Sequence, residues 1–239
     1  MPARGDRLPG SLWLCSIVIG TLAGIVFLAF PEIDLIASRA FLVGKGTFAG
    51  QLRGSMHVLR DVFVAAFCVS IAITLAGLVV TRSRARRWLH LTSPQWLFLA
   101  ICLAVGPGLV TNVILKDHWG RARPKQVVEF GGAKEFTPPL IPSDQCTSNC
   151  SFVSGEAASI FMPFYAAGLV APQFGAVLLA AGTLGGFAAG LVRMSQGAHF
   201  LSDVIFAGVF MALTAAMVHR AVFGRAASEP RLGDLVRDT

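Results

Sequence analysis

Charged residues are scarce in this sequence of 239 residues. Asp, Glu, Lys and Arg together make up 14% of the chain, whereas hydrophobic residues make up 54%. In an average soluble protein about a quarter of the residues are charged. A chain of this length is usually one domain. The shortage of charge excludes an ordinary soluble domain and indicates a membrane protein.

The sequence also lacks a continuous basic face. The net charge is +7, because 20 Lys and Arg residues outnumber 13 Asp and Glu residues. These cations are divided among short segments between apolar runs, whereas nucleic-acid-binding proteins gather them on one face, interleaved with aromatic residues. We therefore expect no nucleic-acid partner, and no feature of the sequence implies an obligatory protein partner.

Cysteine is infrequent, and most of it carries no functional signal. Cys15, Cys68 and Cys102 lie inside apolar runs, where a thiol behaves as a small hydrophobic side chain. Cys146 and Cys150 lie in a polar loop, where a disulfide forms if the loop faces an oxidising compartment. A metal site is the alternative, but no third or fourth ligand lies nearby at a suitable spacing.

In place of frequent charges, the sequence contains long uncharged runs. A bilayer-spanning helix needs about 20 apolar residues. Three runs of this length occupy residues 12–30, 62–81 and 95–115. Gly106-Pro107-Gly108 interrupts the third run and predicts a kinked or opened helix. We interpret the first run as an uncleaved membrane span.

A fourth uncharged run, residues 157–192, is too long for one span and is broken by Pro172 and Gly175. We divide it into a fourth helix that begins near Phe152 and a fifth that ends near Val192. A last helix covers residues 199–223. The prediction is an all-α membrane protein of six transmembrane helices. Its domain is residues 1–223, and residues 224–239 form a flexible cytoplasmic tail.

The topology follows from a basic block at residues 82–87, which contains four arginines. Lys and Arg concentrate in cytoplasmic loops. Placing this block inside puts both termini in the cytoplasm and residues 31–61, an interfacial amphipathic segment, outside. The loop of residues 116–151 is then also outside, so a disulfide between Cys146 and Cys150 becomes the favoured alternative. We expect a bacterial inner-membrane protein with its chemistry on the periplasmic side.

Three charged or polar clusters then meet at the outer face, at residues 116–124, 153–156 and 193–203. Ionisable residues at membrane depth are expensive and indicate a functional site. Lys116, Arg121 and Arg123 together suit an anion such as phosphate. A basic flank that merely ends a membrane helix is the simpler reading of the first cluster alone.

The other two clusters add an anion site and a polarised histidine. Ser154 and Gly155 begin a helix, whose free N–H groups and dipole favour an anion, although an ordinary helix cap has the same sequence. His199 and Asp203 are four residues apart, which places them on one face if both are helical. The carboxylate can then polarise the imidazole for nucleophilic or base chemistry. A structural histidine is the alternative.

The spacing of these residues resembles the three-part signature of the type 2 phosphatidic acid phosphatase superfamily. The matching positions are Lys116, six residues, then Arg123-Pro124; Ser154-Gly155; and Arg193, five residues, His199, three residues, Asp203. The resemblance implies a metal-independent phosphatase without a cofactor, with His199 as the nucleophile that becomes phosphorylated and Asp203 as its orienting partner. It implies phosphate binding by Lys116, Arg123, Arg193, Ser154 and Gly155, whereas Arg121 has no family-matched role and is interpreted as a helper.

The chain departs from the signature at two positions. Val192 replaces a serine of the family. Glu156 replaces the histidine that, in the family, protonates the leaving oxygen. A carboxylic acid can do this if burial keeps it protonated, although nearby arginines favour its anion. We hypothesise that Glu156 takes this role, with His118 as a second candidate donor.

The resemblance implies hydrolysis of a phosphorylated membrane lipid. We expect lipid A first, then undecaprenyl pyrophosphate, phosphatidic acid or phosphatidylglycerol phosphate. A lipid phosphotransferase is a close alternative, because a phosphohistidine can pass its phosphoryl group to a second lipid. A catalytically silent lipid-binding protein is another, supported by Glu156 and opposed by His199 and Asp203. The apolar runs disfavour a soluble haloperoxidase, which shares the signature.

Overall fold

The computed structural model describes residues 4–44, 46–84 and 87–224. Five helical segments in this part of the chain are long and apolar enough to cross a membrane. These segments are Leu8–Ala29, Gly54–Arg84, Ser93–His118, Pro172–Ser195 and Leu201–Phe223. The all-α membrane fold class is confirmed. The fourth predicted helix, which begins near Phe152 in the prediction, exists as α7 (Gly155–Val170), and at 16 residues it is shorter than these five segments.

Four of the spanning segments are built on the long helices α1 (Arg4–Ala29), α4 (Gly54–Arg84), α8 (Gly175–Ser195) and α9 (Leu201–Phe223). The fifth begins as α5 (Ser93–Leu103) and continues through two of the shorter elements up to His118. The shorter elements are α2 (Glu32–Arg39), β1 (Leu42–Gly44), β2 (Thr47–Phe48), α3 (Ala49–Leu52), η1 (Ala104–Leu115), α6 (Lys116–His118), η2 (Pro124–Gln126), η3 (Val128–Phe130) and η4 (Pro172–Phe174). Strands β1 and β2 pair as an antiparallel hairpin.

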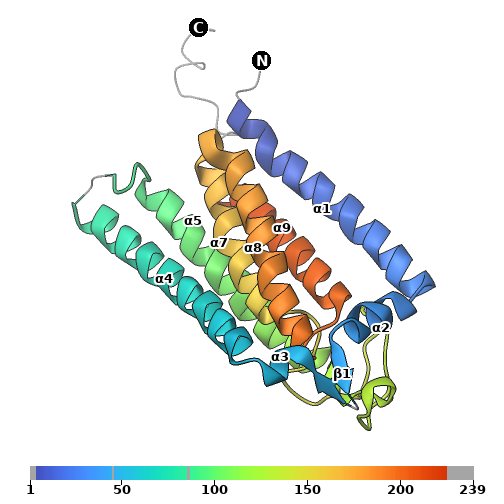
Figure 1. Ribbon diagram of the computed structural model, residues 1–239. Helices are drawn as coiled ribbons and strands as arrows, with labels where there is room; N and C mark the ends of the chain where they lie inside the picture. Colours follow the sequence, from blue (N-terminus) through green and yellow to red (C-terminus); the bar gives the residue numbers. More distant parts are fainter. Residues whose placement is uncertain (1–3, 45, 85–86, 225–239) are drawn as a thin grey trace, which may run out of the picture.

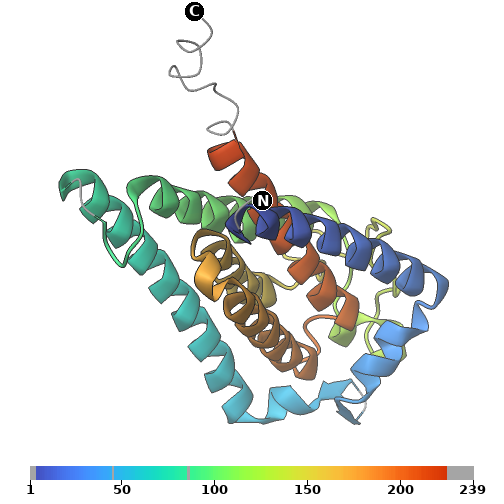
Figure 2. The same cartoon turned by 90° about the horizontal axis from the view of Figure 1, so that it is seen from above.

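Helix α7 lies in the middle of the bundle, surrounded by the longer helices (Figure 2). Most of its side chains are buried. Small residues on α8 let the two helices approach, because a Cβ on Gly182 would lie 2.6 Å from the Cβ of Phe164, and one on Gly186 would enter the Phe161 ring. Close approach at small residues is a common basis of helix packing in membranes. The central position explains why α7 is short: its first turn starts inside the protein.

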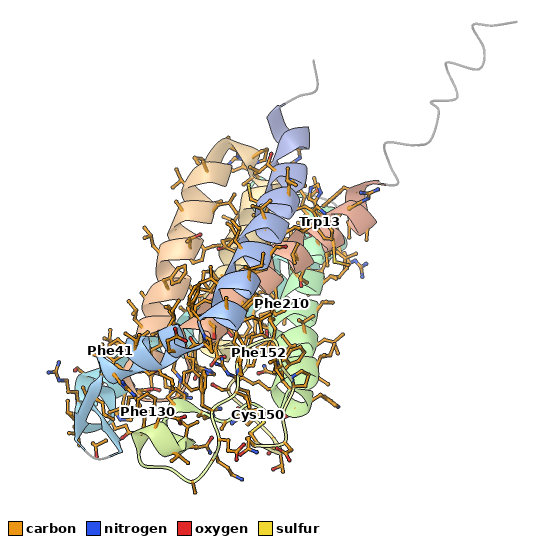
Figure 3. The ribbon with its side chains drawn as sticks, turned by 90° about the vertical axis from the view of Figure 1, so that its right-hand side faces the viewer. Trp13, Phe41, Phe130, Cys150, Phe152 and Phe210 are labelled. Carbon is orange, nitrogen blue, oxygen red and sulfur yellow. A yellow bond between two sulfur atoms is a disulfide. The ribbon has the colours of Figure 1, made fainter. Side chains whose placement is uncertain are left out.

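The two ends of the bundle differ (Figure 1). The start of α1 and the end of α9 lie at one end, whereas α2, the hairpin, α3 and the loop after α6 lie at the other. Figure 3 shows Trp13 near the first end and Phe130 and Cys150 near the second. A cluster of Phe48, Ala122, Val127, Phe130 and Phe200 packs the segment between α1 and α4 against that loop. We call this second end the loop end.

The predicted irregularity in the third span is present. Element η1 is wound as a wider π-helix with Pro107 inside it. Proline lacks the N–H that an α-helix would use, and π-helical turns accommodate such defects. Gly106 packs directly on α7, since a Cβ there would lie 2.2 Å from the Cε of Met162. The chain thus leaves η1 close to the start of α7 and delivers Lys116 there.

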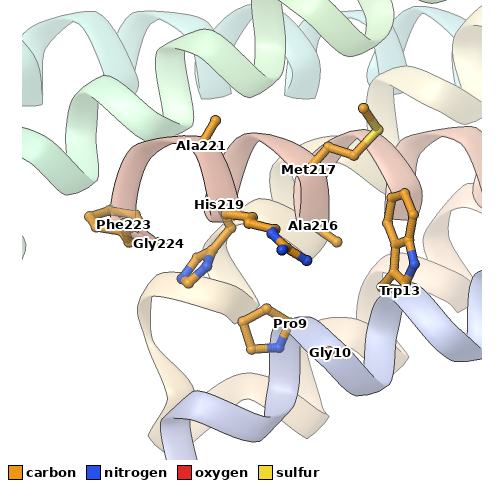
Figure 4. Close-up of a pocket in the computed structure, with 10 residues that line it drawn as sticks. Pro9, Gly10, Trp13, Ala216, Met217, His219, Ala221, Phe223 and Gly224 are labelled. Atoms are coloured by element: carbon orange, nitrogen blue, oxygen red, sulfur yellow. The ribbon is translucent and has the colours of Figure 1, made fainter. Parts of the chain in front are cut away.

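A cavity of about 740 Å³ lies at the end of the bundle opposite the loop end (Figure 4). It separates the start of α1 from the last turns of α9. Its walls include Pro9, Gly10, Trp13, Met217 and Phe223. It is remote from the loop end, where the three polar clusters lie.

Two parts of the predicted topology concern residues outside the described ranges. They are residues 85 and 86 of the basic block and residues 225–239 of the tail, with Arg225, Arg231 and Arg237.

Candidate active site

The three polar clusters meet at the loop end of the bundle. Glu156, in the first turn of α7, contacts both Arg193, at the end of α8, and His199, just before α9. Its Oε1 lies 3.1 Å from Arg193 Nε, and its Oε2 lies 3.9 Å from His199 Nε2. The structure therefore brings together the second and third clusters, and Lys116 joins them from α6.

His199 is completely buried and lies before α9. The expectation that His199 and Asp203 share a helical face is wrong, because α9 begins only at Leu201 and His199 lies outside it. The imidazole Nδ1 lies 2.7 Å from the carbonyl oxygen of Ser151 and 3.7 Å from Asp203 Oδ2. A carbonyl only accepts hydrogen bonds, so Nδ1 carries the proton and Nε2 keeps its lone pair. Nε2 is buried and has no hydrogen-bond partner, which leaves it available as a nucleophile.

The protonation state of His199 also suits a nucleophile. Burial lowers the pKa of the imidazole, and the neighbouring Asp203 carboxylate opposes this only in part. The neutral ring is therefore favoured down to a lower pH than for an exposed histidine.

Asp203 acts on His199 mainly through Ser151. Its Oδ2 accepts hydrogen bonds from Ser151 Oγ and from the backbone N–H of Phe200, at 2.8 Å for the latter. The second bond caps α9, as carboxylates in a first helical turn commonly do. The carboxylate thus fixes the backbone on both sides of the imidazole, whose direct hydrogen bond goes to the Ser151 carbonyl.

Arg121 does not belong to the phosphate-binding set, so that prediction is wrong. The side chain is fully buried. Its Nε donates to the Thr137 carbonyl at 2.8 Å, Nη1 donates to Asp203 Oδ1 at 2.6 Å, and Nη2 donates to Asp34 Oδ2 at 2.8 Å. Nη1 also reaches Ser202 Oγ. All three guanidinium nitrogens are occupied, so Arg121 orients Asp203.

Asp34 is a buried partner that the sequence analysis missed. It lies on α2, binds Arg121, and accepts the backbone N–H of Ser202 at 2.8 Å. Burial raises the pKa of its carboxyl group, while Arg121 opposes the shift. Nothing in the local sequence separates Asp34 from the exposed charges around it, because its partners lie far along the chain.

Glu156 is held by two arginines. Besides Arg193, its Oε1 accepts a hydrogen bond from Arg60 Nε at 3.2 Å. Arg60 lies near the start of α4 and was not singled out from the sequence. Two guanidinium groups at these distances favour the ionised carboxylate. In this state the two arginines outweigh burial, and Glu156 is ionised. Glu156 can therefore donate a proton only after it has received one when the substrate binds.

The remaining predicted phosphate ligands surround the start of α7. Ser154 caps the helix, and its Oγ accepts from the backbone N–H of Ala157 at 3.5 Å. A Cβ on Gly155 would lie 2.6 Å from Lys116 Nζ, so the ammonium group sits against the helix terminus. The Arg123 guanidinium donates to the Asn149 carbonyl at 2.6 Å and to Asn149 Oδ1.

The loop that holds Asn149 is closed by a disulfide between Cys146 and Cys150, the alternative that the sequence favoured. The backbone N–H of Cys150 donates to the Lys116 carbonyl at 2.9 Å. The disulfide loop therefore connects Asn149, which binds Arg123, to the backbone of Lys116.

His118 does not face the site, so its candidacy as a proton donor is wrong. It is exposed, and its Nδ1 contacts the carbonyl oxygens of Val113 and Ile114 at 2.9 and 3.2 Å. Those carbonyls belong to the end of η1, whose unpaired groups a side chain of this kind satisfies.

Comparison with known proteins matches residues 95–227 to the model of the PAP2 superfamily. The chain belongs to the PAP2 superfamily. It is 36% identical over 222 residues to a lipid A 4'-phosphatase of Francisella tularensis subsp. novicida, covering 88% of this chain and 95% of that protein. It is 35% identical to a lipid A 4'-phosphatase of Rhizobium leguminosarum, covering 75% and 83% of the two chains. A crystal structure of a transmembrane PAP2-type phosphatidylglycerolphosphate phosphatase from Bacillus subtilis aligns with a TM-score of 0.49 at 20% identity, covering 95% of this chain and 99% of that one.

The PAP2 match includes all three polar clusters and excludes two residues that contact them. Asp34 and Arg60 both precede residue 95, where the match begins. Asp34 contacts Arg121, and Arg60 contacts Glu156. The PAP2 site of this chain is thus completed by one residue of α2, in the connection between α1 and α4, and by one residue of α4.

A cavity of about 210 Å³ lies beside the PAP2 site. Phe63, Val64 and Phe67 of α4 form its apolar wall, and Lys116 and Glu156 form part of its polar wall. Such a combination suits a molecule that is apolar at one end and anionic at the other. Within the described residues, no group of three His, Cys, Asp or Glu side chains could hold a metal ion.

Proposed function

We propose that this multi-pass membrane protein is a phosphatase that removes a phosphate monoester group from lipid A, by way of a phosphohistidine at His199. The observation that carries the proposal is the geometry of His199. The ring is buried, Nδ1 is committed to the Ser151 carbonyl, and Nε2 has no hydrogen-bond partner. Nε2 lies 3.9 Å from Glu156, whose carboxylate pairs with Arg193 and Arg60. The two relatives described above, both named lipid A 4'-phosphatase, support this substrate above other phosphorylated lipids.

In the first step, His199 Nε2 attacks phosphorus. The bond from phosphorus to the lipid oxygen breaks, and the leaving oxygen takes the proton that Glu156 carries. Lys116, Arg123 and Arg193 stabilise the charge on the phosphoryl oxygens, together with Ser154 and the N–H groups at the start of α7, including that of Gly155. The imidazole keeps its Nδ1 proton, which the Ser151 carbonyl and Asp203 hold in place.

In the second step, water attacks the phosphohistidine. The bond from phosphorus to Nε2 breaks, its electron pair returns to the ring, and phosphate leaves. The attacking water must lose a proton, and the carboxylate of Glu156 is the nearest acceptor to Nε2 among the contacts observed, at 3.9 Å. The proton gained here is the one that Glu156 gives to the leaving oxygen of the next substrate.

This cycle starts with a proton that the first substrate supplies. A phosphate monoester has a second pKa of about 6 and still carries a proton in part of the population near neutral pH. As the phosphate takes over Arg193, its negative charge also favours protonation of Glu156. Replacing Glu156 by Gln, His and Ala tests the role, with phosphate release as the measurement. An undiminished rate in all three variants removes Glu156 from the mechanism.

The activity itself is tested by presenting purified protein in detergent with a panel of phosphorylated lipids, with and without a chelator. The panel contains lipid A, undecaprenyl pyrophosphate, phosphatidic acid and phosphatidylglycerol phosphate, and products are identified by mass. We expect free phosphate and dephosphorylated lipid A, unaffected by the chelator. Transfer of a labelled phosphoryl group to a second lipid would instead establish a phosphotransferase. Equal release by wild type and H199A from every lipid would indicate a silent protein.

We further propose a bacterial inner-membrane location, with the termini in the cytoplasm and the active site at the periplasmic face. Arg82 and Arg84, in the last turn of α4, lie at the end opposite the site, and the disulfide lies at the site end. A green fluorescent protein fused after residue 224 should fluoresce, and alkaline phosphatase fused there should be inactive. The opposite pair of results would invert the topology.

We also propose that residues 1–223 form the whole catalytic unit and that the tail is dispensable. Deleting residues 224–239 should leave lipid phosphatase activity unchanged. A loss of activity in a well-folded truncated protein would contradict this division.

A further inference from the structure

Arg60 contacts the active site from outside the part of the chain that matches the PAP2 model. It lies in the second turn of α4, and 40% of its side chain is exposed. Its Nε donates to Glu156 Oε1 at 3.2 Å, while Nη1 lies 3.5 Å from Asp61. The α4 helix lies against α7, and the bond from Arg60 to Glu156 is a polar link from α4 to the site.

Glu156 and a substrate phosphate need the same place. The carboxylate uses Arg193 Nε at 3.1 Å and approaches His199 Nε2 to 3.9 Å. A phosphoryl group under attack by Nε2 must occupy the space in front of that nitrogen, within about 3.5 Å. It must also pair with Arg193. Two anions compete for one guanidinium, so the phosphate can bind well only if the carboxylate moves off Arg193.

Arg60 is placed to receive the displaced carboxylate. It shares the same oxygen, Oε1, with Arg193 and approaches from α4. If Arg193 turns to the phosphate, the bond from Arg60 to Oε1 keeps the carboxylate close, with Oε2 still toward the reacting atoms. A bond to one oxygen leaves the other free to carry the proton.

On the basis of the function proposed above, we propose that Arg60 is a positioning residue for the reaction. It holds Glu156 through Oε1 when phosphate replaces the carboxylate on Arg193, and it thereby opens the phosphate site and aims Oε2 at the leaving oxygen. Arg60 acts through Glu156 and has no contact of its own with His199 among the observed interactions.

The test is a double-mutant cycle on binding of inorganic phosphate, measured by isothermal titration calorimetry on the purified full chain in detergent. R60Q should bind phosphate about tenfold more weakly, the effect of losing one charged hydrogen bond, because Glu156 then stays on Arg193. E156Q should bind phosphate more tightly than wild type. In the E156Q background, the R60Q change should have no further effect.

Two results would overturn the proposal. Equal phosphate affinity of R60Q and wild type would show that Arg60 does not relieve the competition. A tenfold loss that persists in the E156Q background would show that Arg60 binds phosphate directly. Because no lipid is present, this cycle can succeed even if lipid A proves to be the wrong substrate, so the two failures are distinguishable.

Matched controls separate positioning from folding. R53Q removes the same charge from an exposed arginine just before α4 and should leave both phosphate affinity and melting temperature unchanged. R60K, which keeps the charge and a donor, should recover part of the affinity. With lipid substrate, R60Q should lower kcat as well as raise KM, since Oε2 is no longer aimed. A change in melting temperature that R60K does not restore, with affinity unchanged, would instead assign Arg60 a structural role and refute the proposal.

Discussion

Two clusters of oppositely charged side chains lie beside His199 at the loop end of the bundle, and they differ in how completely their members are paired. In the cluster around Arg121, every guanidinium nitrogen donates a hydrogen bond, and the carboxylates of Asp34 and Asp203 are each bound by several donors. In the cluster around Glu156, Arg60 is partly exposed, Arg193 shares its partner, and His199 Nε2 has none.

The difference separates structure from chemistry. A buried charge without a partner is costly, so a fully paired cluster holds its geometry and has no capacity for a ligand. An incompletely paired cluster with excess positive charge is open to an anion. The first cluster fixes the backbone around His199, and the second cluster is where phosphate can bind. The signature residues alone do not reveal this division. Arg193 of the open cluster belongs to the signature, and Arg121 of the paired cluster lies two residues before the signature residue Arg123.

The strongest test of the open cluster is H199N. Asparagine can still donate to the Ser151 carbonyl but has no nucleophilic nitrogen. Removal of a covalent nucleophile costs roughly 10⁴- to 10⁶-fold in kcat. We expect that loss with little change in melting temperature, measured by lipid A dephosphorylation and by thermal unfolding in detergent. Substantial residual turnover would place the nucleophile elsewhere.

The strongest test of the paired cluster is R121M. It leaves Asp34 and Asp203 buried without their cation, and breaking a buried ion pair in this way costs about 3–5 kcal/mol. We expect a large drop in melting temperature, with activity lost as a consequence. A normal melting temperature together with weaker phosphate binding would return Arg121 to the substrate site and remove the distinction between the two clusters.

R193M is the matched change in the open cluster. Loss of one preorganised cation at a developing negative charge typically costs about 10²- to 10³-fold in rate. We expect this loss in kcat/KM, whereas melting temperature should fall much less than for R121M, because Glu156 keeps Arg60 as a partner. If both variants unfold at the same lowered temperature, then both clusters are structural.

The pH dependence of stability should also follow the burial of His199. Its pKa is lowered in the folded protein, so below the ordinary value of about 6.5 the unfolded chain binds a proton that the folded one does not. Stability should therefore fall as pH decreases through this range, by up to about 1.4 kcal/mol per pH unit, until the lowered pKa is reached. Wild type should lose more stability than H199N between pH 7 and pH 5. Parallel curves would show that the imidazole titrates normally.

The smallest expected effect belongs to the disulfide. Closing a loop of this size contributes about 2 kcal/mol in the chain-entropy model. In C146S/C150S, Asn149 should hold Arg123 less firmly, so we expect KM to rise more than kcat falls. Wild type treated with reductant should behave in the same way, and the variant should not respond to reductant. A response of the variant would point to another thiol.

Much of the fold could be predicted because it depends on local composition. Uncharged runs located the long helices, and Gly106-Pro107-Gly108 located the irregular span. The charge rule brought the three clusters to one end. The length of α7 could not be foreseen, since Ala157 and the residues after it read as one apolar run whether they face lipid or protein.

The site was predictable where residues act within a known spacing, and not where their partners are remote. His199, Glu156 and Arg193 do meet. Arg121 was assigned to phosphate because its buried acceptor, Asp34, is 87 residues away. Arg60 was overlooked because Glu156 is 96 residues away. The sequence spacing of residues indicates which of them share a face of one helix, whereas these contacts depend on how separate helices pack.

The cap of α9 has a consequence for the order of events during synthesis. Ser202, at the start of this last helix, binds Asp34 across 168 residues of chain. Asp34 therefore waits for this partner until residue 202 has left the ribosome and α9 has entered the membrane. A truncated or stalled chain can insert its early helices but cannot complete the nucleophile's surroundings, so an unfinished protein is also an inactive one.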